Sequence, residues 1–186
     1  DFNYSSNDFI SKLGFKNKFN FYLKNSNSIG KNDSIYTSNA QLDGMSLIKF
    51  DTSFPLIKLK DKDIVRETLT PKISFRLNPG NNMNNYRDST SIITADNAFD
   101  INRLGISDDF EAGRSLTFGL DYKIDPVEKR QSDENIKDKY LELKLATVIR
   151  DQHEKDIPKS STINKKNSNI FGSINANLLD NINLSY

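Results

Sequence analysis

The densest group of polar side chains that could do chemistry lies between residues 102 and 114. Its members are Asn102, Arg103, Asp108, Glu111 and Arg114. Arginine and carboxylate side chains form strong, often bidentate ion pairs, so such a group could fix a loop or bind a partner. The alternative is a solvated loop whose ion pairs contribute little to stability. The residue types alone leave both interpretations open.

A divalent cation site is the next possibility, because Asp108, Asp109 and Glu111 offer clustered oxygen ligands. Their spacing matches no cation-binding loop, and a plain acidic loop explains them better. The chain also has no cysteine, which excludes a thiolate metal site. We therefore predict no metal site.

Covalent or acid–base catalysis would need a nucleophile beside a base, and the sequence offers no such pair. It contains one histidine and no cysteine, and it has neither a Gly-x-Ser-x-Gly motif nor a glycine-rich phosphate-binding loop. We predict that the protein is not an enzyme and needs no cofactor. The near balance of 26 basic and 25 acidic residues also argues against a nucleic-acid partner.

The elements that would position these side chains follow from strict alternation of apolar and polar residues. From Leu116 to Ile124 every second residue is apolar, which is typical of a β-strand with one apolar face. The segment 140–150 fits a strand or a helix, and its neighbours favour a strand. A weaker strand is expected at 45–60, with Pro55 at an edge, bend or bulge. Similar alternation predicts strands at 15–25, 66–78, 114–124, 170–178 and 182–186.

An outer-membrane β-barrel is the fold that these strands favour. No segment approaches the roughly 20 apolar residues of a transmembrane helix, whereas a membrane β-strand needs only about 9–11. Long polar stretches at 25–39, 78–107, 125–138 and 150–169 contrast with a tight turn at 179–181, as in barrels with long loops on one side. The faces opposite the apolar residues suit a water-filled interior: Lys18, Asn20, Lys72, Arg76, Asp121, Lys123, Glu142 and Lys144. Aromatic residues expected near strand ends suit interfacial girdles: Phe15, Tyr22, Phe75, Tyr122, Tyr140 and Tyr186.

The stretch from Asp96 to Gly119 resembles a signature of the lipopolysaccharide-assembly outer-membrane protein (LptD) family. The strands expected at 69–79 and 140–150 also follow the family's order, and the resemblance covers roughly residues 40–186. Asp109 and Leu104 depart from the family pattern, which favours arginine and an aromatic residue there. The matching positions are Asn97, Phe99, Asn102, Arg103, Gly105, Asp108, Glu111, Gly113, Arg114 and Gly119.

The resemblance implies an all-β fold, an antiparallel transmembrane β-barrel fragment, with residues 1–186 as one partial barrel domain. The implied function is a structural wall of the barrel that inserts lipopolysaccharide into the outer leaflet of a Gram-negative outer membrane. The implied partners are lipopolysaccharide, outer-membrane lipids, a plug lipoprotein, and periplasmic bridge proteins reached through a missing N-terminal domain. In such a barrel we expect the loop with the polar cluster at 102–114 to fold into the lumen, where its ion pairs fix the loop or meet the plug lipoprotein. The chain starts without methionine and stops inside an alternating pattern, so we expect a piece of a longer protein.

Two alternatives remain at this point. One is a different outer-membrane barrel, such as a porin or a nutrient receptor, and the other is a soluble β-sandwich binding domain. The direction of Leu116, Phe118 and Leu120 separates a barrel from a sandwich. These side chains would point outward on a membrane barrel, whereas in a sandwich they would pack against a second sheet.

Overall fold

The computed structural model describes residues 1–31, 38–60, 65–80, 92–105, 110–126, 140–155, 157–179 and 182–185. Within them a single 3-10 turn, η1 (Lys159–Ser161), is the one helical segment, and no helix could cross a membrane. The remaining elements are β1 (Phe2–Ser5), β2 (Phe9–Ile10), β3 (Lys16–Ser28), β4 (Gln41–Ser53), β5 (Leu56–Lys60), β6 (Val65–Asn78), β7 (Gly113–Pro126), β8 (Tyr140–Arg150), β9 (Phe171–Leu179) and β10 (Ile182–Ser185).

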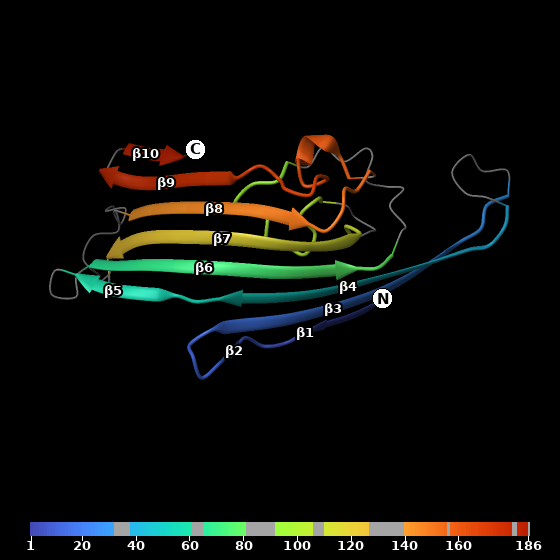
Figure 1. Cartoon of the computed structure of the whole chain (residues 1–186), viewed down its shortest axis with the longest axis horizontal. Helices are drawn as coiled ribbons and strands as arrows, with labels where there is room; N and C mark the ends of the chain where they lie inside the picture. Colours follow the sequence, from blue (N-terminus) through green and yellow to red (C-terminus); the bar gives the residue numbers. More distant parts are fainter. Residues whose placement is uncertain are drawn as a thin grey trace.

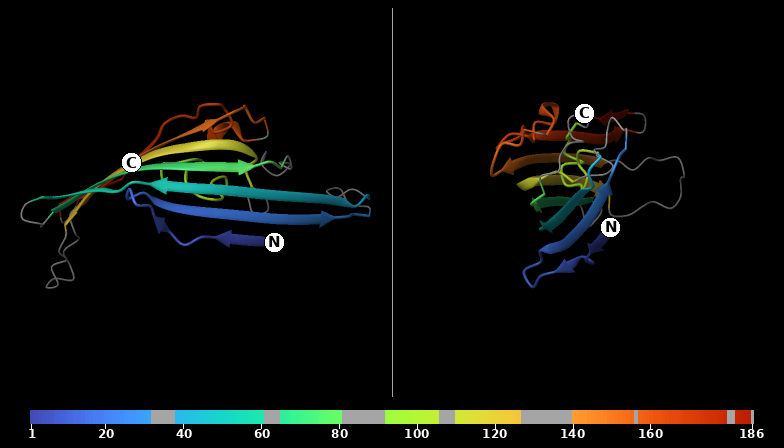
Figure 2. Two further views of the ribbon diagram at one scale, coloured as in Figure 1. Left: turned by 60° about the horizontal axis from the view of Figure 1, so that its bottom comes forward. Right: turned by 90° about the vertical axis from the view of Figure 1, so that its right-hand side faces the viewer.

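These strands form one antiparallel sheet in which neighbours along the chain are mostly neighbours in space (Figure 1). The order is β1-β3-β4-β6-β7-β8-β9-β10, with β2 beside β3 and β5 beside β6. Figure 2 shows that the sheet twists and curves. Among the described residues β1 and β10 each pair with one strand only, so the sheet is open. The all-β prediction is confirmed, and the meander is the topology of an up-and-down barrel wall.

The strands expected from alternation are all present, and the ambiguous segment 140–150 is β8. The weak segment 45–60 is divided, because β4 pairs with the second half of β6 and β5 pairs with the first half. Phe54 and Pro55 form the break between them, as the proline required. Alternation did not predict β1 and β2, which have four and two residues and are too short to show a period.

Apolar side chains of the sheet are exposed on one face and polar side chains are buried on the other, which is the opposite of a sheet in a soluble protein. In β7, Leu116, Phe118 and Leu120 are 39%, 37% and 37% exposed, whereas Ser115 and Thr117 between them are 4% and 0% exposed. We call the exposed apolar side the outer face and the opposite side the inner face. Since no second layer covers the outer face in the described chain, the soluble-sandwich alternative is wrong.

The register aligns the exposed apolar side chains of neighbouring strands. Phe50 lies opposite Phe75, Phe75 opposite Leu116, and Leu116 opposite Ile149. The result is a continuous apolar strip across the sheet. We call it the outer band and define it as Phe50, Ile73, Phe75, Leu116, Phe118, Leu120, Leu145, Ile149 and Ile174.

Connections alternate between the two ends of the sheet because neighbouring strands are antiparallel. The β3–β4, β6–β7 and β8–β9 connections lie at the Asn78 end, and the β7–β8 and β9–β10 connections lie at the Pro126 end. The polar stretch at 125–138 was predicted to belong with the other long connections. That prediction is wrong, because the strand directions place its two ends beside the tight turn after β9.

Candidate functional site

Two long connections fold against the inner face at the Asn78 end, and the first of them is seen on the concave side of the sheet in Figure 2. The first joins β6 to β7, and we call its described residues, 92–105 and 110–112, the inner loop. The second joins β8 to β9. Together with β8 they enclose one apolar cluster, which packs the two connections against the sheet. Its buried members are Ile93, Ala95, Ala98, Leu104, Ala112, Ala146, Val148, Ile157 and Ile163.

The inner loop is shaped locally by asparagine and glycine. The Asn97 side-chain oxygen accepts the Thr94 N–H at 2.8 Å, and its Nδ2 donates to the Ile92 carbonyl at 3.0 Å. Gly105, with φ +65°, donates its N–H to the Asn102 carbonyl at 3.1 Å. Asparagine side chains stabilise turns of this kind, and glycine adopts positive φ without strain.

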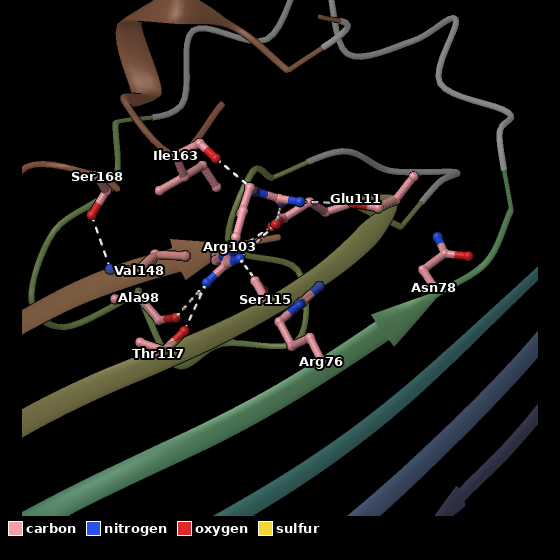
Figure 3. Close-up of polar contacts among 12 residues, drawn as sticks. Arg76, Asn78, Ala98, Arg103, Glu111, Ser115, Thr117, Val148, Ile163 and Ser168 are labelled. Atoms are coloured by element: carbon pink, nitrogen blue, oxygen red, sulfur yellow. Dashed lines mark hydrogen bonds and ion pairs between the residues drawn. The ribbon is translucent and has the colours of Figure 1, made fainter. Parts of the chain in front are cut away.

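Arg103 makes most of the polar contacts that hold the inner loop (Figure 3). Its Nε and Nη2 each donate to one Glu111 carboxylate oxygen at 2.5 Å. The two side chains are only 0% and 3% exposed. Nη1 donates to Thr117 Oγ1 at 3.0 Å and to the Ala98 carbonyl at 3.3 Å, and Nη2 also donates to Ser115 Oγ at 3.0 Å. One side chain thus connects the loop to successive inner positions of β7.

Glu111 is shared with a second buried arginine, Arg150 at the end of β8. Arg150 donates from Nε to the Ile163 carbonyl at 2.7 Å and from Nη1 to the Ala112 carbonyl at 3.0 Å. One carboxylate therefore lies between two guanidinium groups, and we call Arg103, Glu111 and Arg150 the buried triad. It links the inner loop, β8 and the second connection.

β6 and β3 supply further contacts to the loop. Arg76 Nη1 donates to the Asp100 carbonyl at 2.8 Å, and Asn78 Nδ2 donates to the Phe110 carbonyl at 2.9 Å. The Phe110 ring lies 5.5 Å from the ring of Tyr22. Tyr22 was predicted to be a girdle residue near a strand end, which is wrong, because it faces inward from the middle of β3 and packs on the loop.

Phe99 and Gly119 fit together on the inner face. A Cβ atom added to Gly119 would lie 2.6 Å from two atoms of the Phe99 ring. On the same ring the Lys72 ammonium lies 4.6 Å from the centroid, and Lys72 also pairs with Asp121 at 2.7 Å. The Phe99 ring thus lies between the backbone of Gly119 and the Lys72 ammonium. A side chain at position 119 would collide with the ring, which explains a glycine inside this long strand.

The five predicted site residues have different surroundings. Arg103 and Glu111 pair directly and are buried. Asn102 is exposed at the loop surface, and Arg114 is exposed and pairs with Asp151 at 2.6 Å rather than with the buried triad. Asp108 lies outside the described residues. Contact of any of them with a plug lipoprotein stays a prediction.

Arg150, Ser115 and Thr117 are the partners that sequence reasoning missed. The alternation of β7 and β8 does place all three on the polar face, which was the available signal. Their meeting with Arg103 depends on the strand register, in which Ser115 lies opposite Arg150, and on the path of the loop. Among the described residues no three histidine or acidic side chains come together as a metal site.

Comparison with known proteins bears on the identity of this sheet. The family model described as LPS transport system D (LptD) matches residues 16–186, from β3 to β10 with the inner loop included. No curated protein and no solved structure matches the chain. The match extends further toward the N-terminus than the resemblance at 40–186 did. The chain therefore belongs to the LptD family of outer-membrane lipopolysaccharide transport proteins.

Proposed function

We propose that the chain is a section of the wall of an outer-membrane β-barrel that inserts lipopolysaccharide into the outer leaflet in a Gram-negative cell. The observation that carries this proposal is the arrangement of the sheet, with an exposed apolar outer band and a polar inner face that two connections partly cover. The family is one of transport rather than catalysis, which supports a structural role.

The outer band suits contact with lipid. A contiguous apolar surface of this kind is unfavourable in water, whereas hydrocarbon accommodates it without cost. β6, β7 and β8 have 14, 14 and 11 residues, enough for tilted strands to cross a bilayer. The ladder between neighbouring strands satisfies backbone N–H and C=O groups that lipid could not bind.

The inner face suits contact with a hydrated molecule. It carries ion pairs at 2.7 Å between Lys72 and Asp121 and between Lys144 and Asp96. A polar interior beside an apolar exterior gives an amphipathic lipid a place for its saccharide and a place for its acyl chains. This division supports lipopolysaccharide as the transported molecule.

A plug lipoprotein is the partner we propose for the lumen. Several polar side chains of the inner loop are exposed, namely Thr94, Asp96, Asp100 and Asn102, and this exposed surface would make such a contact, whereas Arg103 and Glu111 would act indirectly by holding the loop. Contact with periplasmic bridge proteins would be made by other parts of a longer polypeptide.

The test is a charge placed in the outer band of the full-length protein. We expect Phe118→Lys to destabilise the bilayer-folded state by about 2–4 kcal/mol, the range for a cation near the bilayer midplane. Phe118→Leu keeps the site apolar and serves as the matched control. The folded fraction is read from heat-modifiable gel mobility after refolding into vesicles, and surface lipopolysaccharide is measured in cells. Unchanged bilayer folding of Phe118→Lys would contradict the proposal.

A further inference from the structure

A cavity of about 210 Å³ opens on the inner face beside the inner loop, level with the middle of β6. Residues of β3, β4 and β6 form its floor and walls, and the segment before β2 contributes at its rim. Most of its surface is apolar, and lysines from three different strands contribute to its lining. Its charged lining residues are Lys16, Lys18, Lys49, Lys72, Asp8 and Asp51.

The charges in this lining do not balance. Lys16 pairs with Asp8 at 2.8 Å, Lys49 pairs with Asp51, and Lys72 pairs with a carboxylate outside the lining. Lys18 is exposed and forms no ion pair with any residue in the described part of the chain. A positive charge is therefore available at the cavity, and lysine is a common ligand of phosphate groups.

Phe99 forms an apolar wall of the same cavity. Its ring is held in place by Gly119 beneath it and by the Lys72 ammonium 4.6 Å from its centroid. Ligand sites commonly combine an aromatic surface with a few placed polar groups. The volume is below the usual range for a whole drug-sized ligand, so the cavity suits one sugar unit rather than an entire glycolipid.

We propose that this cavity binds a phosphorylated sugar unit, with its phosphate at Lys18 and its carbon atoms against the part of the Phe99 ring that lines the cavity. Asp8 opposes binding, because it holds the Lys16 ammonium that would otherwise reach the phosphate. The proposal rests on the proposed function, since the phosphorylated saccharide of lipopolysaccharide is the ligand that a barrel of this family would bring to the inner face. It adds the place on the wall where that saccharide is held.

The test measures binding of glucose 6-phosphate to the full-length protein in nonionic detergent by ligand-observed NMR. We expect Lys18→Gln to weaken binding about two- to five-fold, the effect of one exposed ionic contact. Asp8→Asn should strengthen binding about two-fold, because it releases Lys16. Lys123→Gln is the matched control, since Lys123 lies on the inner face of β7 outside the cavity and is partly exposed. It should leave the affinity unchanged.

Three results would overturn the site. They are equal binding of Lys18→Gln and Lys123→Gln, equal binding of unphosphorylated glucose, and binding of inorganic phosphate as tight as that of glucose 6-phosphate. The last result would show a general anion site without a sugar contact. Bilayer folding of Phe118→Lys involves no ligand, so its outcome is independent. If Phe118→Lys folds poorly in bilayers as expected but glucose 6-phosphate does not bind at the cavity, only this inference is refuted. If glucose 6-phosphate binds at the cavity but Phe118→Lys folds normally, only the proposed function is refuted.

Discussion

Removal of the charge on Glu111 is the most informative single change at the inner loop. Glu111→Gln keeps the size of the side chain, and it leaves the buried Arg103 and Arg150 without their shared carboxylate. Their side chains are 0% and 1% exposed. Water therefore cannot replace the lost counter-charge unless the loop moves off the wall.

The expected size of the effect follows from this burial. Removing one partner of a buried ion pair costs about 3–5 kcal/mol, because an uncompensated charge stays behind. The remaining bonds of Arg103 to Ser115 and Thr117 are to neutral groups and soften the loss only in part. We expect Glu111→Gln to destabilise the protein by about 3 kcal/mol.

Arg114→Gln is the matched control, three residues further along the chain at the start of β7. Arg114 pairs with Asp151, and the two side chains are 63% and 34% exposed. An exposed pair of this kind contributes about 0–1 kcal/mol. Urea unfolding of the full-length protein in detergent, followed by far-UV circular dichroism, gives the free energy of unfolding for both variants.

Equal effects of Glu111→Gln and Arg114→Gln would refute the reasoning about the buried triad. The double variant Glu111→Gln/Arg150→Met adds a second check, because Met carries no charge that needs a partner. We expect a coupling energy of about 0.5–3 kcal/mol between the two changes, as for residues in one network. Additive effects would mean that Glu111 and Arg150 do not act together.

Two further predictions concern glycine packing and pH. Gly119→Ala should lower the free energy of unfolding by about 1–3 kcal/mol, because the added methyl group is overpacked against Phe99. Gly172→Ala should have little effect in the same urea experiment, because the nearest atom to its added Cβ is 3.5 Å away. A smaller loss for Gly119→Ala than for Gly172→Ala would contradict this prediction. The hydrogen bond from Lys16 holds the pKa of the Asp8 carboxyl group below its ordinary value of 3.8. The contribution of this ion pair to stability is therefore complete at pH values above 3.8 and is lost as the pH falls through the lowered pKa. A ¹³C NMR titration of Asp8 should show the low pKa in the protein and its return toward 3.8 in Lys16→Gln.

The strands of this protein were predictable because each carries its own signal. A half-buried strand repeats every two residues, and the β7 pattern from Leu116 to Ile124 needs no knowledge of its neighbours. β1 and β2 lack that signal because they are too short. The end of the sheet to which 125–138 belongs also could not be read from that stretch alone, because it depends on the number and direction of the strands before it.

The site was only partly predictable for a similar reason. The cluster at 102–114 stood out by its residue types, and Arg103 and Glu111 do pair. Arg114 belongs to another contact, since it sits on the outer parity of β7 and meets Asp151. Arg150 is distant in sequence and joins the triad only through the pairing of β7 with β8. Types suggest a network, but register decides its members.

The inner face of the wall is divided into a covered part and an open part. At the Asn78 end the buried triad and the apolar cluster hold two connections against β6, β7 and β8, so a passing molecule cannot touch the buried inner positions Ser74, Ser115 and Thr117. Toward the Pro126 end no described connection covers the polar face, and the cavity of about 210 Å³ lies beside the inner loop, with Phe99 in contact with both the cavity and the apolar cluster. Lys18 and Phe99 therefore line one cavity at the border between the wall and the inner loop. Glu111→Gln loosens the loop and should therefore change the affinity for glucose 6-phosphate, because Phe99 belongs to the loop. Arg114→Gln should leave that affinity unchanged. Equal affinities in the two variants would show that binding in the cavity does not depend on the contacts that hold the loop.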